Sequence, residues 1–377
     1  MFKKRYTAPQ LLGVFFLSLG VFSGGTYYLM KNWIGDPGAL FQIVRTMHLI
    51  QRHYVGETDR KKIYDGALKG MVGVLNDPYS SYLDNQDFEA LSTMTEGHFG
   101  GVGMVMGLRK DNQFVVVSPA YKAGIKAGDI LLKIDGEDLS GQSLNEVVKK
   151  IRGQDGSQVT LTLKRGSEEA KDITVTRSDI KLKSVYGRMD GDGIGYIRVT
   201  NFNEDTDKDF GAKLQELRDQ GMKALVLDLR DNPGGLLESG VGVARYLVPK
   251  GPIVSVTDKD GNTQTESSSL EKVDFPLAVL VNHGTASAAE IVSGAIQDTG
   301  SGKLFGVKTY GKGVVQNIFL LSNQTAVKLT VARYYTPSGR SIDKVGITPD
   351  EVVEAAGEEG ANQLQAAENY LRQQLQQ

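Results

Sequence analysis

The chain of 377 residues contains no cysteine and only four histidines. The absence of cysteine excludes disulfides, a thiolate nucleophile and zinc–thiolate sites. None of the histidines has a neighbour at a spacing typical of a metal site. Charge of one sign is not in excess either, because the formal net charge is −2, which argues against a nucleic-acid partner. The composition thus predicts no metal or redox cofactor and no nucleic-acid binding.

Charged residues are also absent from one long run near the N-terminus, residues 11–30. A run of about 20 apolar residues is long enough to cross a bilayer as a helix. Residues 1–10 carry a basic cluster, which should stay cytoplasmic and place everything after Lys31 outside the cell. The sequence therefore predicts a transmembrane signal anchor at 11–30. A cleaved signal peptide, giving a secreted protein, is the alternative.

The rest of the chain is too long for one core, and its periodicity changes along its length. It divides into a linker with an N-terminal helical region, a compact β-rich unit, an α/β core and a C-terminal helix, at 31–97, 98–178, 179–356 and 357–377. In the β-rich unit, a Ser143–Glu146 capping box predicts a helix that runs to Ile151. The predicted fold class is multidomain α/β.

The α/β core is predicted from apolar runs that alternate with helical patterns. The expected strands lie at 194–199, 224–229, 253–256, 277–281, 314–320 and 327–332, and the expected helices at 210–217, 236–247 and 288–297.

The most informative segment is Asn282–Glu290, a turn of small residues between a buried-looking strand and an apolar helix. It places Ser287 at the helix start, where the helix dipole and free N–H groups favour developing negative charge. An acyl-transfer nucleophile needs that geometry, since the oxyanion forms beside the attacking oxygen. The same residues form a Ser-x-x-Glu capping box, which needs no catalysis to explain it. A nucleophilic Ser287 therefore requires a base elsewhere.

Two residues are candidates for that base. His283 lies in the same turn as Ser287, where a lone histidine is more often a turn residue. Lys312 lies between Gly311 and Gly313, which let the backbone approach other segments closely. Most lysines are solvated surface residues. A general-base lysine must be neutral near pH 7, which takes about 3–4 kcal/mol of desolvation in an apolar cleft.

The lysine segment also resembles a phosphate-binding loop. Residues 306–312 match its first seven positions, but the eighth is Gly313, where a P-loop needs Ser or Thr to hold magnesium. A strand-like run follows instead of a helix. The P-loop hypothesis fails on both counts, and with it a nucleotide-hydrolase function.

A third element is Asn232–Gly235, a Pro-Gly-Gly turn that follows the buried-looking strand ending at Leu229. Glycine N–H groups at a strand end form an anion-binding nest, which suits one half of an oxyanion hole. A plain tight strand–helix connection is the alternative.

In their order along the chain, these motifs resemble the carboxy-terminal processing proteases, also called tail-specific proteases, from about Phe41 to Leu371. The landmarks are Asp77–Tyr82, Phe99–Gly103, Gly128–Gly136, Asp228–Arg230, Asn232–Gly235, Ala286–Glu290, Gly311–Gly313 and Gln316. Six or more ordered motifs are very specific, although any single one is weak.

The resemblance implies a serine endopeptidase with a Ser–Lys dyad and a crotonase-like catalytic core of the kind found in Clp-type proteases. The implied site residues are the nucleophile Ser287, the general base Lys312, the lysine-orienting Gln316, and the oxyanion-hole N–H donors Ala288 and either Gly234 or Gly235. No cofactor is implied.

The resemblance also implies that 98–178 is a PDZ domain. Its Gly100, Gly101, Val102 and Gly103 would present N–H groups to a terminal carboxylate while the peptide adds as an edge strand. A glycine-rich β-turn is the alternative. The implied partners are proteins with free, flexible, apolar C-termini. The preceding helices either cap the core or pair two protomers into a homo-oligomer, and the sequence does not choose.

The expected function is therefore that of a membrane-anchored protease that cleaves extracytoplasmic proteins near their C-terminal tails. The competing hypothesis is a membrane-tethered PDZ binding protein whose protease core is inert.

Overall fold

The computed structural model describes residues 28, 31–32, 35–118, 123–321 and 324–377. The chain forms two compact units, the first ending at Tyr82 and the second beginning at Leu83. All but one residue of the predicted transmembrane segment 11–30 lies outside the described residues. Within the described ranges, no helix combines the length and the apolar character needed to cross a membrane.

The first unit contains two helices, α2 (Pro37–His53) and α3 (Arg60–Gly73). Each begins at an aspartate whose side chain accepts hydrogen bonds from backbone N–H groups of the first turn, as helix N-termini require. Neither helix has a buried residue. Apolar side chains such as Phe41 and Met71 are 65% and 53% exposed. The strand β1 (Ser81–Leu83) leads into the second unit.

The second unit opens with helix α4 (Asn85–Glu96), capped by the carboxylate of Asp84. The helix ends at Gly97, whose φ of 78° is the left-handed conformation typical of glycine after a helix. The chain then forms a two-stranded antiparallel ribbon from β2 (His98–Gly101) and β9 (Ser178–Lys181). The β-rich region lies between these two strands in the sequence.

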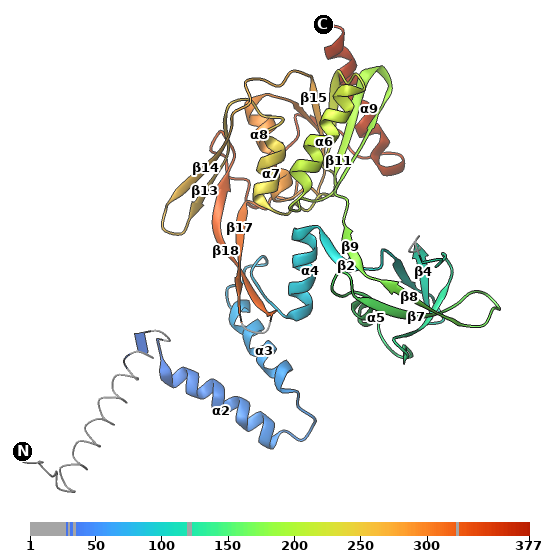
Figure 1. Cartoon of the computed structure of the whole chain (residues 1–377). Helices are drawn as coiled ribbons and strands as arrows, with labels where there is room; N and C mark the ends of the chain where they lie inside the picture. Colours follow the sequence, from blue (N-terminus) through green and yellow to red (C-terminus); the bar gives the residue numbers. More distant parts are fainter. Residues whose placement is uncertain (1–27, 29–30, 33–34, 119–122, 322–323) are drawn as a thin grey trace, which may run out of the picture. The chain divides into compact units, whose positions relative to one another are not determined.

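That region is an antiparallel sheet around one helix (Figure 1). The strand order is β3-β4-β5-β7-β8, with β6 paired to β5. The bounds are β3 (Val105–Leu108), β4 (Phe114–Ser118), β5 (Ile130–Ile134), β6 (Glu137–Asp138), α5 (Leu144–Ile151), β7 (Gln158–Lys164) and β8 (Lys171–Thr176). Helix α5 starts at the predicted capping box, and its Val147 packs with Val116 and Leu161 in the core.

The α/β core is built on a second, mostly parallel sheet of order β10-β11-β12-β15-β16-β19. Strand β10 is antiparallel to β11, and the pairs from β11 to β19 are parallel. The bounds are β10 (Val185–Met189), the short 3-10 helix η1 (Gly191–Gly193), β11 (Ile194–Val199), β12 (Ala224–Asp228), β15 (Leu277–Val281), β16 (Lys303–Gly306) and β19 (Glu351–Val352).

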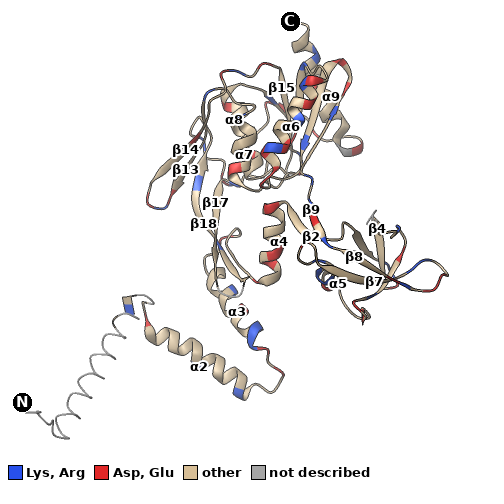
Figure 2. Cartoon of the chain, in the orientation of Figure 1, with Lys and Arg blue, Asp and Glu red and all other residues tan. Residues whose placement is uncertain are grey.

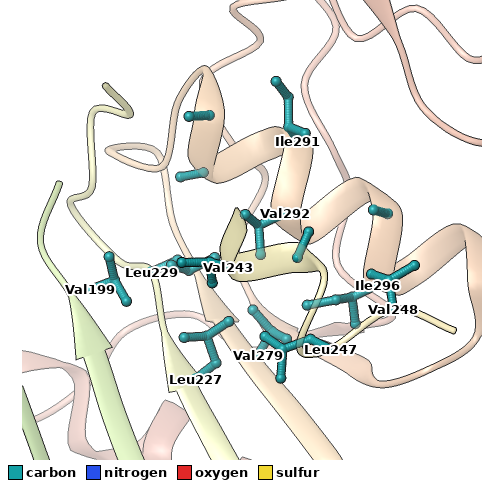
Figure 3. Packing of buried hydrophobic residues seen from close by; sticks show 14 of the residues in the cluster. Val199, Leu227, Leu229, Val243, Leu247, Val248, Val279, Ile291, Val292 and Ile296 are labelled. Carbon is teal, nitrogen blue, oxygen red and sulfur yellow. The ribbon is translucent and has the colours of Figure 1, made fainter. Parts of the chain in front are cut away.

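Helices cover both faces of this sheet, so its central strands are buried throughout. On one face, α6 (Thr206–Asp219), α7 (Leu237–Ala244) and α8 (Ala288–Thr299) pack on alternate strand residues. Figure 3 shows this packing, with Leu227 and Val279 of the strands under Val243 and Val292 of the helices. On the other face, α9 (Ala361–Leu375), which follows the 3-10 helix η3 (Glu358–Gly360), packs on the intervening residues.

A further antiparallel arrangement lies beside the parallel sheet. Strand β18 (Ala326–Tyr335) pairs with β17 (Val314–Leu320) and with β13 (Gly251–Asp258), which in turn pairs with β14 (Thr263–Ser268). Strand β17 begins two residues after Lys312, where the P-loop hypothesis would have needed a helix.

The predicted core elements are all present: β11, β15 and β17 have the predicted bounds, and the others have shifted ends. Helix α7 ends at Ala244, three residues before the predicted end, and β12 stops at Asp228. Strands β10, β14, β16 and β19 were not predicted. The residues of β10, β14 and β19 are largely exposed or partly buried and lack a continuous apolar run. Strand β16 is mostly buried but is only four residues long.

Candidate active site

Ser287 lies in the sharp turn that joins β15 to α8. Its φ and ψ are 55° and −121°, a conformation that non-glycine residues rarely adopt. Such backbone strain persists only where the surroundings impose it, and a serine on a strained strand-to-helix turn is a known way of exposing a nucleophilic oxygen. Helix α8 begins at the next residue, so the helix N-terminus faces this side chain's position.

Hydrogen bonds tie this turn to the Asn232–Gly235 loop. The buried hydroxyl of Thr285 donates to the carbonyl of Leu229 at 2.8 Å. The N–H of Ala286 donates to the carbonyl of Asn232 at 2.9 Å. These bonds fix the two loops to each other, which the sequence could not establish because they are more than 50 residues apart.

Gly234 lies against Ser287. A β-carbon added at Gly234 would be 2.7 Å from Cβ of Ser287 and 3.0 Å from the nitrogen of Ala288, and its φ of 96° also favours glycine. The N–H of Gly234 already donates to the side-chain oxygen of Asn232 at 2.8 Å. Within the described part of the chain, the N–H groups of Gly235 and Ala288 have no partner, and Gly235 is exposed.

Glu290 joins the serine turn to the lysine loop. It is fully buried, and its carboxylate accepts four hydrogen bonds. One oxygen accepts from the backbone N–H of Ser287 and of Lys312, both at 2.9 Å. The other accepts from the N–H of Gly311 at 2.8 Å and from the hydroxyl of Thr309 at 2.5 Å. Burial raises the pKa of the Glu290 carboxyl above its usual range, although these four donors act in the opposite direction.

Tyr334 of β18 makes a second link between the same two residues. Its hydroxyl lies 3.1 Å from the carbonyl oxygen of Ser287 and donates to the carbonyl oxygen of Lys312. The side chain is 1% exposed. Because a buried tyrosine hydroxyl in a packed core cannot move freely, it holds the two carbonyls at a fixed separation.

The glycines beside Lys312 allow close backbone approach, as predicted. A β-carbon at Gly311 would meet the nitrogen of Gly346 at 2.8 Å, and one at Gly313 would meet the nitrogen of Asp343 at 2.5 Å. Larger residues at either position would push the lysine loop away from the segment that supports it.

Gln316 lies at an irregularity of β17. The register with β18 shifts between Val315 and Gln316, and such bulges re-aim a side chain. The amide nitrogen of Gln316 donates to the carbonyl of Val314 at 3.2 Å. Like Lys312, Gln316 is partly buried.

The predicted catalytic and oxyanion residues all line one cavity of about 740 Å³. They are Ser287, Ala288, Gly234, Gly235, Lys312 and Gln316. His283 is exposed and does not line this cavity. The structure therefore brings Lys312, and not His283, into the same space as Ser287.

A buried ionic cluster at Asp228 and Arg230 directly precedes the Asn232–Gly235 loop and supports it. The guanidinium of Arg230 donates three hydrogen bonds to Asp228, at 2.9, 3.1 and 2.6 Å, and further bonds to the carbonyl of Gly360 and the side chain of Gln363 at 3.1 and 3.2 Å. The hydroxyl of Tyr196 donates to Asp228 at 2.7 Å. Burial, together with Asp228, raises the pKa of Tyr196 to about 12, which keeps it a donor. The C-terminal helix thus contributes to this support.

The predicted carboxylate-binding glycines have different surroundings. Gly100 and Gly101 belong to strand β2 and pair with β9. A β-carbon at Gly100 would lie 1.9 Å from the carbonyl oxygen of Gly153, so this glycine is needed for packing. Val102 is 7% exposed, and Gly103, with φ of 66°, turns the chain toward β3.

Sequence reasoning missed Glu290 and Tyr334 as parts of the site. The sequence indicates Glu290 only as the end of a capping box, and the bond from Ser287 is indeed one half of such a box. Its bonds to Gly311 and Lys312 cross 21 and 22 residues. Nothing in the local pattern around Tyr334 distinguishes it from an ordinary core tyrosine.

Comparison with known proteins agrees with this architecture. The profile of Peptidase family S41 matches residues 193–353, and that of the PDZ domain matches residues 115–165. A third, the activating protease CtpB N-terminal domain, matches residues 23–87. Most of α4, residues 88–96, lies outside all three matches.

Several curated proteins are similar along most of the chain. A carboxy-terminal-processing protease of Bartonella bacilliformis is 40% identical over 90% of this chain and 82% of its own length. The carboxy-terminal processing protease CtpB of Bacillus subtilis is 35% identical over 88% of this chain and 71% of its own. A solved structure, the photosystem II D1 C-terminal processing protease, aligns with a TM-score of 0.49 and 32% identity over 86% of this chain and 88% of its own.

The identity and coverage of these relatives, together with the matched peptidase and PDZ regions, decide the classification. The chain belongs to peptidase family S41 and is a PDZ-containing serine peptidase of the carboxy-terminal processing type.

Proposed function

We propose that Ser287 is the nucleophile and Lys312 the general base of a Ser–Lys dyad, with Gln316 orienting the lysine. The observation that carries this proposal is the double link between the two loops. Glu290 accepts from the N–H groups of both Ser287 and Lys312, and the hydroxyl of Tyr334 contacts the carbonyls of both. Preorganisation of this kind supplies rate because the reacting groups need not be ordered during the reaction.

In the proposed reaction, the neutral amine of Lys312 takes the proton of the Ser287 hydroxyl as its oxygen attacks a peptide carbonyl. The tetrahedral intermediate collapses when the leaving amine receives that proton, which leaves an acyl-enzyme on Ser287. Lys312 then takes a proton from water, the resulting hydroxide attacks the ester, and Ser287 is released with its proton restored.

For the oxyanion hole, we propose the N–H groups of Ala288 and Gly235. The sequence left Gly234 and Gly235 as alternatives. The bond from Gly234 to Asn232 occupies the first of these N–H groups, whereas Gly235 is exposed in the same cavity. The nearby N-terminus of α8 adds a favourable dipole for the developing negative charge.

We propose that the PDZ region captures the C-terminus of the substrate. Strand β3 pairs only with β4 within the described sheet, so its other edge is available to a peptide strand. The backbone around Gly100, Gly101, Val102 and Gly103 would receive the terminal carboxylate. The guanidinium of Arg152 lies 4.3 Å from the ring of Phe99 beside this segment, and its buried Nε has no partner among the described residues.

We further propose that residues 11–30 anchor the chain in the membrane and place the catalytic unit outside the cytoplasm, with a secreted form after signal cleavage as the alternative. The support is the uncharged run of sequence and the basic residues before it. The uncovered apolar side chains of α2 and α3 favour pairing with a second copy. The proposed substrates are extracytoplasmic proteins with free, flexible, apolar C-termini.

The test uses the full chain in a mild detergent, incubated with a protein that carries an unstructured apolar tail, and follows the product masses over time. Ser287→Ala and Lys312→Ala are assayed beside the parent. Cleavage near the tail by the parent, lowered at least about 1000-fold in both variants, supports the dyad. Tail binding without cleavage in all three proteins would instead indicate a tethered binding protein with an inert core.

A further inference from the structure

Helix α4 forms part of the wall of the active-site cavity. Leu91, Met94 and Thr95 line the same space as Ser287 and Lys312. Peptidases of one family share a catalytic core, and they differ in the segments that contact substrate side chains. These three residues lie outside the matched family regions, so α4 is a candidate for such a segment.

The C-terminal end of α4 is fixed to the catalytic core. The carbonyl of Thr95 accepts from the N–H of Glu204 at 2.9 Å. A β-carbon at Gly97 would lie 2.3 Å from the side-chain nitrogen of Asn203, a buried residue that also accepts from Asp205. This contact requires glycine and holds the helix end against the core. Helix α4 is therefore held in a fixed position as part of the cavity wall.

The cavity side of α4 is apolar. The hydroxyl of Thr95 donates to the carbonyl of Leu91 at 3.0 Å, so it is satisfied within the helix. Met94 is 53% exposed, which is high for a methionine lining a cavity. A flexible thioether with free surface adapts to aliphatic side chains of different shape.

Other elements supply apolar lining residues to the same cavity. Leu237 and Val241 come from α7, Ile291 from α8 and Val314 from β17. Of the charged residues that line the cavity, Arg245 and Glu266 form an ion pair at 2.8 Å, and Glu238, Lys312 and Lys328 line it as well. An aliphatic side chain of a bound polypeptide would thus find apolar surface on several elements, including α4.

The charge on α4 disfavours acidic substrate residues. Its charged side chains, Asp87, Glu89 and Glu96, are all acidic (Figure 2). The C-terminal end of the helix, where Met94 lies, also carries the negative end of the helix dipole. An aspartate or glutamate of the substrate at this position would lose hydration without gaining a cationic partner from α4.

We propose that Leu91 and Met94 are specificity-determining residues, which contact one aliphatic side chain of the substrate near the scissile bond and select against an acidic one. This inference rests on the proposed function, because it requires the substrate to occupy the cavity at Ser287.

The test compares kcat/KM for three protein tails that differ at one position near the cleavage site, which carries Leu, Ala or Asp. Met94→Ala and Leu91→Ala should each lower the Leu-to-Ala preference about tenfold, mainly through KM. Met94→Leu should restore most of that preference. Met71→Ala is the matched control, because Met71 is also 53% exposed but does not line the cavity; it should leave the preference unchanged.

A variant that gains activity toward one substrate distinguishes a specific contact from a general loss of activity. Met94→Lys should raise the relative kcat/KM of the Asp tail about tenfold, because it places a cation on the wall. The role of α4 would be overturned if every α4 variant kept the substrate preferences of the parent. If Ser287→Ala still abolished cleavage in the same experiment, the protease function would stand. A parent that does not cleave any tail would overturn both.

Discussion

The carboxylate of Glu290 accepts a hydrogen bond from the backbone N–H of Lys312, with 2.9 Å between Oε2 and the nitrogen. The same oxygen accepts from Ser287, three residues before Glu290 in the sequence. One buried carboxylate therefore sets the relative position of the proposed nucleophile and base. This explains why a glutamate occupies a fully buried position at the start of an apolar helix, where an unpaired charge would be costly.

Glu290→Gln should lower kcat strongly while the protein stays folded. Glutamine has one acceptor oxygen, so its NH₂ group must face donors that now have no partner. Hydrogen bonds to a charged group are worth about 1.5–3 kcal/mol each, which corresponds to a loss of about 10- to 150-fold for each bond broken. Steady-state kinetics measure the effect. Glu271→Gln, at an exposed position that does not line the cavity, is the matched control and should keep the parental kcat. Parental kcat in Glu290→Gln would contradict the linking role.

The same carboxylate should give the parent an acid limb of activity. All four partners of Glu290 are donors, so a proton on the carboxyl displaces one of them. Because burial raises the pKa of Glu290 above its usual value of 4.5, activity should fall at a pH above that value. A raised pKa contributes fully to the stability of the folded state below 4.5, and this contribution is lost as the pH rises through the raised pKa. The loss should therefore precede acid unfolding, as circular dichroism in parallel with the assay would reveal.

On the alkaline side, kcat/KM should rise as the amine of Lys312 loses its proton. The profile should be measured on the parent with a tail substrate that has no titrating group in the range. A flat profile from about pH 6 to 10 would count against Lys312 as the base.

Gly234→Ala should reduce activity more than Gly261→Ala, although both glycines have positive φ. A β-carbon at Gly234 would displace Ser287 and the nitrogen of Ala288, which we propose as an oxyanion-hole donor, whereas Gly261, with φ of 86°, has no atom within 4 Å. We expect at least about a 100-fold loss of kcat for the first variant, comparable to the loss of one oxyanion donor. Similar kinetics for the two variants would show that the close contact at Gly234 is not important.

Acid stability of the PDZ region should depend on Arg165. Its guanidinium donates to Asp129 at 2.7 Å, and this bond is the main cause that lowers the pKa of Asp129 below its usual 3.8. A lowered pKa stabilises the folded state above 3.8, and the contribution disappears as the pH falls through the lowered value. Arg165→Met should therefore speed hydrogen exchange in β5 and β7 at about pH 6, and this effect should shrink as the pH falls through the lowered pKa of Asp129. An effect that stays the same as the pH falls would contradict the assignment.

Sequence predicted the local parts of the site and missed the long-range ones. The strand–turn–helix around Ser287 and the glycines around Lys312 follow from local chemistry, and the structure contains both. The choice between Gly234 and Gly235 depends on the side chain of Asn232. The hydrogen bond from Gly234 to Asn232 forms only in the folded loop, and no hydrophobic periodicity in the sequence indicates it.

The fold was predictable to a similar extent. Continuous apolar runs identified β12 and β15, because parallel strands covered on both faces are apolar throughout. Strand β14 is mostly exposed and polar, and it is held by pairing with β13. The hydrogen bond from Arg230 to Gln363 of α9 could not be predicted either, because it joins residues 133 apart in the sequence.

The most direct test of the dyad is covalent trapping of the nucleophile. The full chain would be treated with a small serine-directed phosphonylating reagent over a range of pH, and the modified residue would be mapped by peptide mass spectrometry. We predict one adduct, on Ser287, which forms faster as the pH rises and is nearly lost in Lys312→Ala. An adduct on another residue, or labelling of Ser287 that does not depend on Lys312, would contradict the Ser–Lys mechanism.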